Sequence, residues 1–397
     1  MSPAGLCPAA GARPRWELAD VFRLYGEAYR QAHRLPGRSL KVMRAVERCR
    51  TAALGGHRER CEGCGFERPA YNSCRNRHCP KCGSLAKARW LEQRQVELLP
   101  VGYFHLVFTL PHELNRLALA NQKRVCSLLF QAVSETLLEF GRTHLHGQVG
   151  FLCVLHTWDQ TLGDHFHLHC LIPGGALSFD HSRWIPAREN FLFSVAALSR
   201  LFRGKFVHGL EEAFRRGSLH FPGLLLPLSD PAAFSGWLRP LRRKSWVVYA
   251  KRPFASPDTV LDYLARYTHR VALSNHRLLS IDGGRVRFSY RDRKDHNATR
   301  VMTLEAGEFM RRFLLHVLPD GFMRIRHFGF LANRSKKQNL ARCRQLLDVE
   351  TPAPAPAAKS NRERWIEITG VDPARCPVCH VGTLVVMGPL PPKLDSS

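Results

Sequence analysis

Three histidines alternate with other residues in one short segment, and this segment constrains the fold more than any other. They are His165, His167 and His169, within residues 164–172. Successive side chains of a β-strand point to opposite faces, so the three imidazoles share one face while Leu168 points toward a core. Burying such a face is costly unless each ring finds a partner, and neutral imidazole is a good ligand for divalent metals. The segment therefore predicts a strand on which His167 and His169 bind a metal ion.

A third protein ligand is expected, because two imidazoles rarely hold a metal alone. The sequence offers His165, His156 on a neighbouring predicted strand, Asp164 and Asp159, and leaves the choice among them open. With phosphate and water oxygens completing the shell, Mg²⁺ or Mn²⁺ is the expected ion, acting as a Lewis acid on a phosphate. The alternative is a polar strand face whose histidines have no common role.

Two tyrosines, Tyr263 and Tyr267, form a second candidate group. A helix is predicted from Pro257 to about residue 268, and residues four apart on a helix share a face. A phenol has a pKa of about 10, so it needs a metal or a basic group to become a nucleophile at neutral pH. Arg266 and Arg270 are close enough in sequence to help and are predicted to contact DNA. Aromatic packing is the alternative, but a metal that polarises phosphate and phenols that attack it together describe an enzyme that cuts DNA and stays attached.

The charge of the chain favours a polyanionic partner. There are 59 Lys and Arg against 33 Asp and Glu among 397 residues, a net charge of +26. A basic excess of this size favours nucleic acid through counterion release. No run of about 18 apolar residues predicts a membrane span, and the first residues lack the features of a signal peptide. We therefore expect a cytoplasmic protein that associates with the nucleoid when it acts.

The cysteines are mostly paired, which indicates metal binding in a reducing compartment. Cys61, Cys64, Cys79 and Cys82 form two C-x-x-C pairs 14 residues apart, a spacing typical of a four-cysteine structural zinc site. His57, Cys74 and His78 are interleaved with them, and they make either a second site or an altered ligand set. Basic residues surround this module, so it is also expected to contact DNA phosphates, among others through Arg75, Arg77 and Lys81.

A further pair, Cys376 and Cys379, resembles half of a zinc ribbon. Since no second pair follows it, the pair either recruits His380 and another ligand or has degenerated. The remaining cysteines are predicted to be structural or incidental: Cys7, Cys49, Cys126, Cys153, Cys170 and Cys343.

The pattern of apolar residues predicts a mixed α+β chain with five parts. Helices are expected at about 16–35, 39–53, 85–99, 116–140, 187–217 and 305–317, and strands at 103–110, 150–156, 166–172, 245–250, 278–281 and 285–290. Residues 218–243 read as loop-rich. The parts are an N-terminal helical segment (1–55), a zinc-binding domain (56–95), a nuclease domain (100–345), a stiff Pro/Ala linker (351–359) and a C-terminal tail (360–397).

The motifs in this order resemble the rolling-circle transposases of the insertion-sequence-91 family. The segment from Cys61 to Cys82 is similar to the N-terminal zinc-binding domain of that family, and residues 104–111, 165–175 and 263–274 are similar to its nuclease domain. The resemblance covers residues 40 to 335, and the half zinc ribbon near the C-terminus departs from it.

The resemblance implies an HUH-type endonuclease, in which an antiparallel sheet flanked by helices carries the histidine pair on a central strand. His167 and His169 would be metal ligands, and Tyr263 and Tyr267 the nucleophiles. The enzyme would nick single-stranded DNA at the ends of its element, form a 5′-phosphotyrosine and transfer the displaced strand to target DNA. No P-loop motif is present, so a host helicase is an expected partner.

Two other functions are considered. One is a non-catalytic zinc-containing DNA-binding protein, in which the tyrosines only pack. The other is a plasmid-type replication initiator or relaxase that uses the same chemistry. Cleavage under a divalent metal would separate the first from an enzyme, and a gene flanked by element ends would separate the second from a transposase.

Overall fold

The computed structural model describes residues 14–254, 259–260, 271–292, 295–349 and 359–393. Tyr263, Tyr267, Arg266 and Arg270 lie outside the described residues. Within them, helices combine with sheets whose strand pairs are antiparallel, so the predicted α+β class is confirmed. No helix in the described parts of the chain is long and apolar enough to cross a membrane.

The largest sheet has five strands in the order β13-β5-β6-β3-β9. All neighbouring pairs are antiparallel, and β6, which carries the histidines, is the middle strand. The two strands predicted at residues 150–156 and 166–172 therefore form an antiparallel hairpin. The strands are β3 (Tyr103–Thr109), β5 (Gly150–Trp158), β6 (Asp164–Pro173), β9 (Val248–Phe254) and β13 (Ile325–Gly329).

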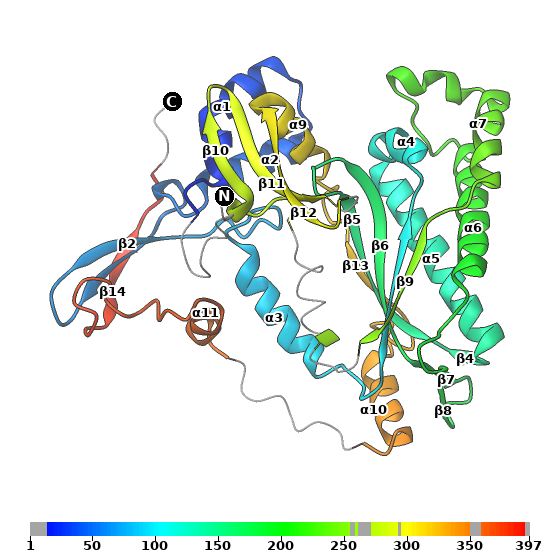
Figure 1. Cartoon of the computed structure of the whole chain (residues 1–397). Coiled ribbons are helices and arrows are strands. Elements are labelled where there is room, and N and C mark those ends of the chain that lie inside the picture. Colours follow the sequence, from blue (N-terminus) through cyan, green and yellow to red (C-terminus); the bar gives the residue numbers. More distant parts are fainter. Residues whose placement is uncertain (1–13, 255–258, 261–270, 293–294, 350–358, 394–397) are drawn as a thin grey trace, which may run out of the picture.

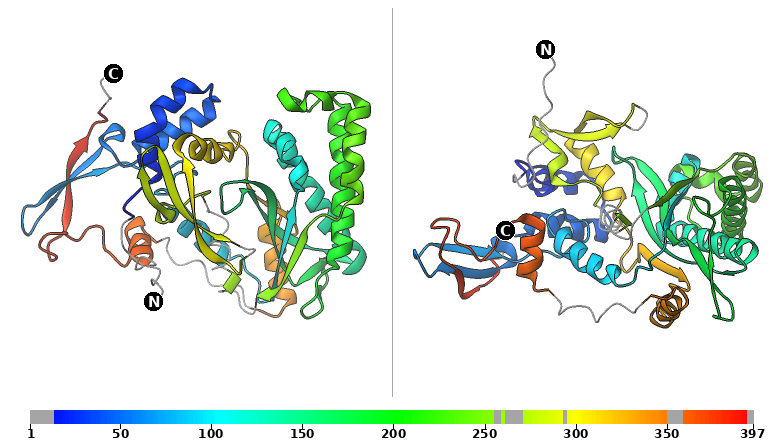
Figure 2. Two further views of the ribbon diagram at one scale, coloured as in Figure 1. Left: turned by 45° about the horizontal axis from the view of Figure 1, so that its top comes forward. Right: turned by 60° about the horizontal axis from the view of Figure 1, so that its bottom comes forward.

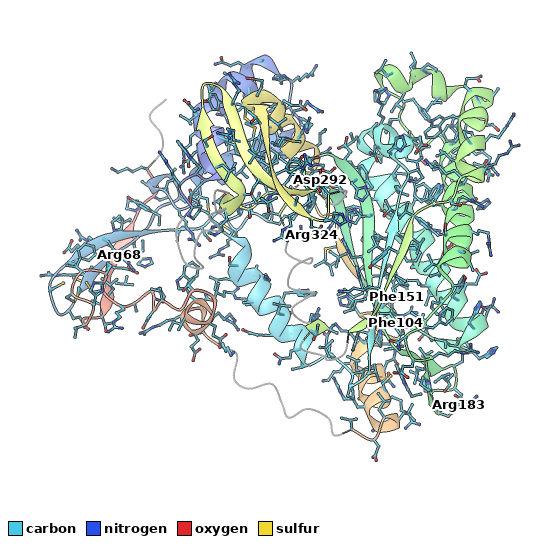
Figure 3. The ribbon with its side chains drawn as sticks, viewed as in Figure 1. Arg68, Phe104, Phe151, Arg183, Asp292 and Arg324 are labelled. Carbon is cyan, nitrogen blue, oxygen red and sulfur yellow. The ribbon has the colours of Figure 1, made fainter. Side chains whose placement is uncertain are left out.

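Helices cover one face of this sheet (Figure 1). Alternate strand residues, including Phe104, Phe151 (both labelled in Figure 3) and Leu168, form the main core with Phe130 and Phe202 of these helices. Because these residues are buried under the helices, the alternate residues of β6, which include the histidines, point to the other face of the sheet. The elements on this side are η2 (His112–Leu114), α4 (Asn115–Ala120), α5 (Gln122–His144), α6 (Val195–Arg215), η3 (Gly223–Ser229) and α7 (Pro231–Arg243).

The expectation that residues 218–243 are loop-rich is wrong, because α7 is a helix of 13 residues. Its start carries a clear local signal: Asp230 caps the helix by accepting from the Ala233 amide, with Pro231 at the first position. Gly236 and Pro240 inside it weigh against a helix in the sequence. The burial of Phe234 and Leu238 in the main core stabilises it nonetheless.

The other face of the sheet packs against α3 (Gly83–Gln95). Trp90 and Leu91 of α3 contact a small cluster that contains Tyr103, Leu152 and Val260. Helix α10 (Lys336–Leu346) packs beside a small separate sheet whose strand order is β4-β7-β8. These strands are β4 (Gly147–Gln148), β7 (Gly175–Ser178) and β8 (Trp184–Pro186).

A second core joins the N-terminal helices to residues 272–317. Phe22 and Val46 of the helices are buried with Phe288, Phe309 and neighbouring residues, so the N-terminal segment shares its core with sequence more than 200 residues away. The two strands predicted at residues 278–281 and 285–290 form a hairpin, and a third strand pairs with the second of them. The elements are α1 (Leu18–Ala32), α2 (Gly37–Arg48), η4 (Asn275–Arg277), β10 (Leu278–Asp282), β11 (Arg285–Asp292), β12 (Ala298–Glu305) and α9 (Ala306–Leu315).

The cysteine-rich module contains both N-terminal and C-terminal residues. A three-stranded sheet runs in the order β14-β1-β2, so the last described strand pairs with the first strand of the chain. Figures 1 and 2 show the C-terminal segment beside the N-terminal hairpin. The elements are η1 (Ala52–Leu54), β1 (Gly56–Cys61), β2 (Glu67–Tyr71), α11 (Asn361–Thr369) and β14 (Leu384–Leu390).

Candidate active site and cysteine clusters

Three buried histidines come together on the face of the central sheet opposite α5 and α6. One nitrogen from each of His156, His167 and His169 lies within 4.8 Å of the others, a spacing suited to a metal ion. The strand register explains the grouping, because His156 of β5 is directly opposite His167 of β6. Opposed residues of an antiparallel pair point to the same side. The group can therefore supply three neutral nitrogen ligands to one divalent cation.

Hydrogen bonds orient two of these rings. His167 Nδ1 lies 2.8 Å from the His165 carbonyl oxygen, which only accepts, so Nδ1 carries the proton and Nε2 is left for a metal. His169 Nδ1 lies 3.0 Å from Nε2 of His105 on β3. Such outer partners fix the orientation and tautomer of metal-binding histidines.

His105 was not among the residues that the sequence singled out. Its strand was predicted, but only the pairing of β3 with β6 shows that it lies beside His169. Burial, with the nearby charge of Lys251, lowers the pKa of His105 to about 3. Lys251 of β9 is opposite His105. It therefore places a positive charge at the edge of the sheet face that carries His156, His167 and His169, the histidine face.

The other proposed third ligands lie outside this group. The ring centroid of His165 is 4.5 Å from that of His167, at the open end of the strand. Asp159 accepts hydrogen bonds from Thr161 and Gly163 in the β5–β6 turn. Burial raises the pKa of Asp164. Among the candidates, the geometry favours His156.

The first described residues of the predicted tyrosine helix, Thr259 and Val260, come just before Tyr263, and Val260 packs on this same face. Thr259 and Val260 are helical, and Val260 is fully buried in the cluster with Tyr103, Leu152 and Leu171. Leu171 is two residues after His169 on β6, so it shares the face of the histidines.

Eight of the cysteines in the described residues form two groups of four, and neither group is the predicted one. The expectation of a single site from Cys61, Cys64, Cys79 and Cys82 is corrected, because the β1–β2 hairpin divides these residues. Cys61 and Cys64 lie at its tip, whereas Cys79 and Cys82 follow β2 back to its base. A strand of six residues spans about 20 Å, too far for one ion.

The first group consists of Cys49, Cys74, Cys79 and Cys82, and the second of Cys61, Cys64, Cys376 and Cys379. In the first, the Sγ atom of Cys82 is 3.4 Å from that of Cys49 and 3.6 Å from that of Cys74. A hydrogen bond with Cys74 lowers the pKa of Cys49 to about 7. In the second group, the backbone amides of Val381 and Gly382 lower the pKa of Cys379 to about 6.

Cys49 was predicted to be structural or incidental, because a lone cysteine at the end of α2 gave no spacing signal. Its place in the first group depends on the return of the chain after β2. His57 and His78 belong to neither group. His57 Nε2 lies 3.1 Å from Glu59 Oε1. Burial and the charges of Arg77 and Arg324 lower the pKa of His78 to about 3.

The three basic residues predicted to contact DNA differ in their surroundings. Arg75 is exposed. Arg77 donates to the main-chain carbonyl of Phe322 at 2.8 Å, and Lys81 forms an ion pair with Glu17. Arg77 and Lys81 therefore also join parts of the protein to one another.

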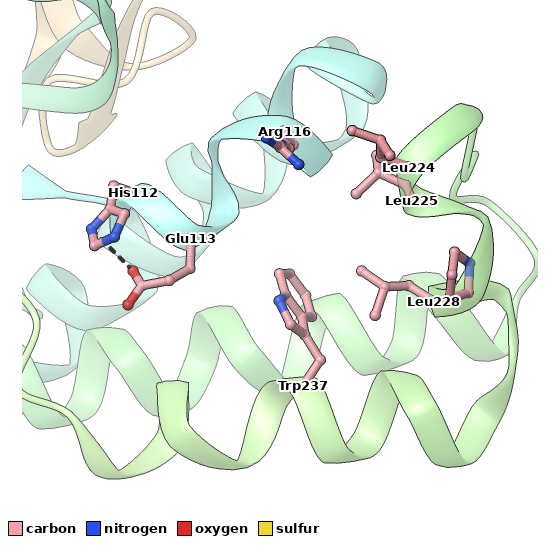
Figure 4. Close-up of a pocket in the computed structure, with 8 residues that line it drawn as sticks. His112, Glu113, Arg116, Leu224, Leu225, Leu228 and Trp237 are labelled. Carbon is pink, nitrogen blue, oxygen red and sulfur yellow. Dashed lines mark ion pairs between the residues drawn. The ribbon is translucent and has the colours of Figure 1, made fainter.

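A surface hollow of about 460 Å³ lies away from the histidines. It is lined by Glu113, Arg116, Leu224 and Trp237 among others (Figure 4). Its walls are η2, α4, η3 and α7, which pack on the helix-covered side of the sheet. The hollow is thus separate from the candidate metal site.

Two protein families match different parts of this chain. Residues 21–110 match the family described as "Transposase zinc-binding domain", and residues 150–339 match the family described as "Putative transposase". The first match contains the whole first cysteine group but only Cys61 and Cys64 of the second. These matches and the cysteine groups support structural zinc.

Two relatives are similar to this chain over most of its length. The "Putative transposase y4qJ" of Sinorhizobium fredii is 51% identical over 381 residues, 95% of this chain and 96% of the relative. The transposase for insertion sequence element IS801 of Pseudomonas savastanoi pv. phaseolicola is 28% identical over 343 residues, 83% of this chain and 79% of the relative. No solved structure matches. The chain belongs to the insertion-sequence-91 family of DNA transposases.

Proposed function

We propose that this transposase is a metal-dependent HUH endonuclease that nicks and joins single-stranded DNA through Tyr263 and Tyr267. The observation that supports this proposal is the cluster of His156, His167 and His169 on the middle strands of an antiparallel sheet. The cluster is buried, yet its sheet face borders Lys251, whose charge suits a phosphate backbone.

His156, His167 and His169 would hold Mg²⁺ or Mn²⁺, which would polarise a non-bridging oxygen of the scissile phosphate. Three neutral imidazoles leave positions for phosphate and water oxygens. His165 and His105 keep two of the ligand rings in place by the hydrogen bonds described above.

Val260 supports the placement of the tyrosines. Positions three and seven residues later share its side of an α-helix, and the sequence predicts a helix through residue 268. Tyr263 and Tyr267 would then lie on the side that Val260 buries against the histidine face.

The reaction follows from these placements. A tyrosine phenol loses its proton and its oxygen attacks phosphorus, the bond to the 3′ oxygen breaks, and that oxygen leaves as a 3′-hydroxyl after taking up a proton. The products are a 5′-phosphotyrosine and a free 3′ end. The second tyrosine would hold a second strand during transfer to target DNA, and the 3′-hydroxyl would prime replacement synthesis, as rolling-circle transposition requires. We propose a host helicase for strand separation and place the reaction in the bacterial cytoplasm.

The test is a denaturing gel of purified protein with labelled single-stranded DNA from the element ends, with Mn²⁺ or with EDTA. We expect a metal-dependent, protease-sensitive adduct with the wild type, and none with Tyr263→Phe/Tyr267→Phe or with His167→Ala. Tyr71→Phe, an exposed tyrosine of the cysteine module, is the matched control and should keep the adduct.

A rival nucleophile can be tested in the same experiment. Tyr249 of β9 is 56% exposed and is paired with Val107, which places it on the histidine face. An adduct that survives the double Phe variant but disappears in Tyr249→Phe would refute the tyrosine assignment. Intact binding without any adduct would favour a non-catalytic DNA-binding role.

A further inference from the structure

We propose that Cys61, Cys64, Cys376 and Cys379 form a second structural zinc site, which fastens the C-terminal segment to the N-terminal module. This site is additional to the group of Cys49, Cys74, Cys79 and Cys82, which lies wholly within the matched zinc-binding domain. Half of its ligands come from residues that neither family match covers.

The spacing of the sulfur atoms fits a tetrahedral zinc site. The Sγ atoms of Cys61 and Cys379 are 3.7 Å apart, as are those of Cys64 and Cys376. With zinc–sulfur bonds of about 2.3 Å, the sulfurs of a tetrahedral site are about 3.8 Å apart. These distances are much longer than a disulfide bond of about 2.05 Å.

Each pair is shaped as a zinc knuckle. The Cys64 amide points to Cys61 Sγ at 3.5 Å, and the Gly382 amide points to Cys379 Sγ at 3.3 Å. The residue after the second cysteine has a positive φ in both pairs, 72° at Gly65 and 58° at His380. Two similar turns therefore direct N–H groups at sulfur atoms, an arrangement that stabilises thiolates.

The backbone around the site brings the two pairs together. β1 and β14 are paired along their length, with Cys61 opposite Leu384. Arg68 of β2, labelled in Figure 3, donates to the Pro373 carbonyl at 2.8 Å. A side chain at Gly382 would lie 2.4 Å from Cys61 Sγ, so the close approach of the two knuckles requires glycine there.

The site would keep the C-terminal helix α11 on α3. Arg364 of α11 forms a two-oxygen ion pair with Glu92 of α3, at 2.8 and 2.9 Å for its closest contacts. Helix α3 in turn packs on the histidine side of the central sheet through Trp90 and Leu91. The zinc site would thus join both ends of the chain to the element that borders the candidate active site.

The experiment measures thiolate-bound metal in the full-length chain. Protein purified under reducing conditions is loaded with Co²⁺, whose thiolate charge-transfer absorption reports cysteine sites and not the histidine cluster, and zinc content is measured in parallel. We expect two thiolate sites per wild-type chain. Cys376→Ser/Cys379→Ser and Cys74→Ser/Cys82→Ser should each retain one.

The matched control is Cys343→Ala, a buried cysteine outside both groups, which should keep both sites. Because a double variant can fail to fold, the wild type is also alkylated with and without a chelator. Chelation should expose Cys64 and Cys379 to the reagent together with Cys376. One thiolate site in the wild type, two in Cys376→Ser/Cys379→Ser, or alkylation of Cys376 that is unaffected by chelation would overturn the proposal.

Discussion

At the scale of single residues, strand register decides which side chains meet. His156 and His169 are 13 positions apart in sequence, yet they belong to one group because β5 and β6 form a hairpin. His105 joins from β3 as the partner of His169 Nδ1. We regard His105 as a positioning residue, since it contacts a proposed ligand and not the metal.

We predict that His105→Ala raises the Mn²⁺ concentration needed for half-maximal adduct formation by about 10- to 100-fold, as loss of an outer-shell partner does. His105→Gln, which keeps a hydrogen-bonding group, should restore much of the affinity. The measurement is a Mn²⁺ titration of adduct formation at saturating DNA.

His327→Ala removes another partly buried histidine on the same face of the sheet, on β13 opposite Leu152, and serves as the control. A lower melting temperature of His105→Ala with unchanged Mn²⁺ dependence would show that His105 is only structural.

At the scale of elements, a few short segments complete sheets whose longer strands the sequence predicts. β13 is one of these, and it pairs with β5 from Ile325 to Gly329. Its end depends on glycine: Gly329 has a φ of 61°, and a Cβ there would lie 1.7 Å from the Val149 carbonyl oxygen. A close backbone contact with Val149 therefore occurs at the end of this edge strand of the central sheet.

We predict that Gly329→Ala lowers the free energy of unfolding by more than about 3 kcal/mol, because steric overlap adds to the cost of a positive φ. Gly321→Ala is the matched control, since Gly321 has a φ of 70° with nothing within 4 Å of the added Cβ. It should lose only about 1 kcal/mol. Equal losses in urea unfolding of the two variants would show that the contact with Val149 is unimportant.

At the scale of the whole molecule, several histidines are buried in the neutral form. His316 is the clearest case: it lies between Thr157 Oγ1 and the Leu162 carbonyl, and burial lowers its pKa to about 4. The unfolded chain has a histidine pKa near 6.5, so below that pH the unfolded state binds a proton that the folded state refuses. The stabilising effect of neutral His316 is therefore present above about pH 6.5 and is lost progressively down to about pH 4.

We predict that between pH 7 and pH 5 this one group lowers the free energy of unfolding by about 2 kcal/mol. His316→Gln keeps a hydrogen-bonding side chain without the titration, so its stability should fall by that much less over the same interval. Urea unfolding of both proteins at the two pH values measures the difference. Identical pH dependence would contradict a depressed pKa at His316.

How much the sequence predicts differs between the two kinds of site. The alternation of His165, His167 and His169 is enough to place them on one face of a strand, because alternation is a local property of the backbone. The third histidine of the group comes from the neighbouring strand β5. Among the candidates that the sequence left open, only His156 is placed by the strand register directly opposite His167. In the cysteine module, the C-x-x-C spacing singled out cysteines that all lie in the two groups, but it led to the wrong combination of pairs.

The sequence by itself determined what depends on near neighbours and on bulk charge: the α+β pattern, the histidine strand, the C-x-x-C pairs and the basic excess that suits DNA. Only the tertiary structure decided which of these parts share a site. Cys61 and Cys379 are 318 residues apart and meet because β1 pairs with β14. Cys61 and Cys79, much closer in sequence, are separated by the length of a strand. Local chemistry is set by spacing along the chain, whereas a shared site is set by which strands and helices bury their apolar faces together.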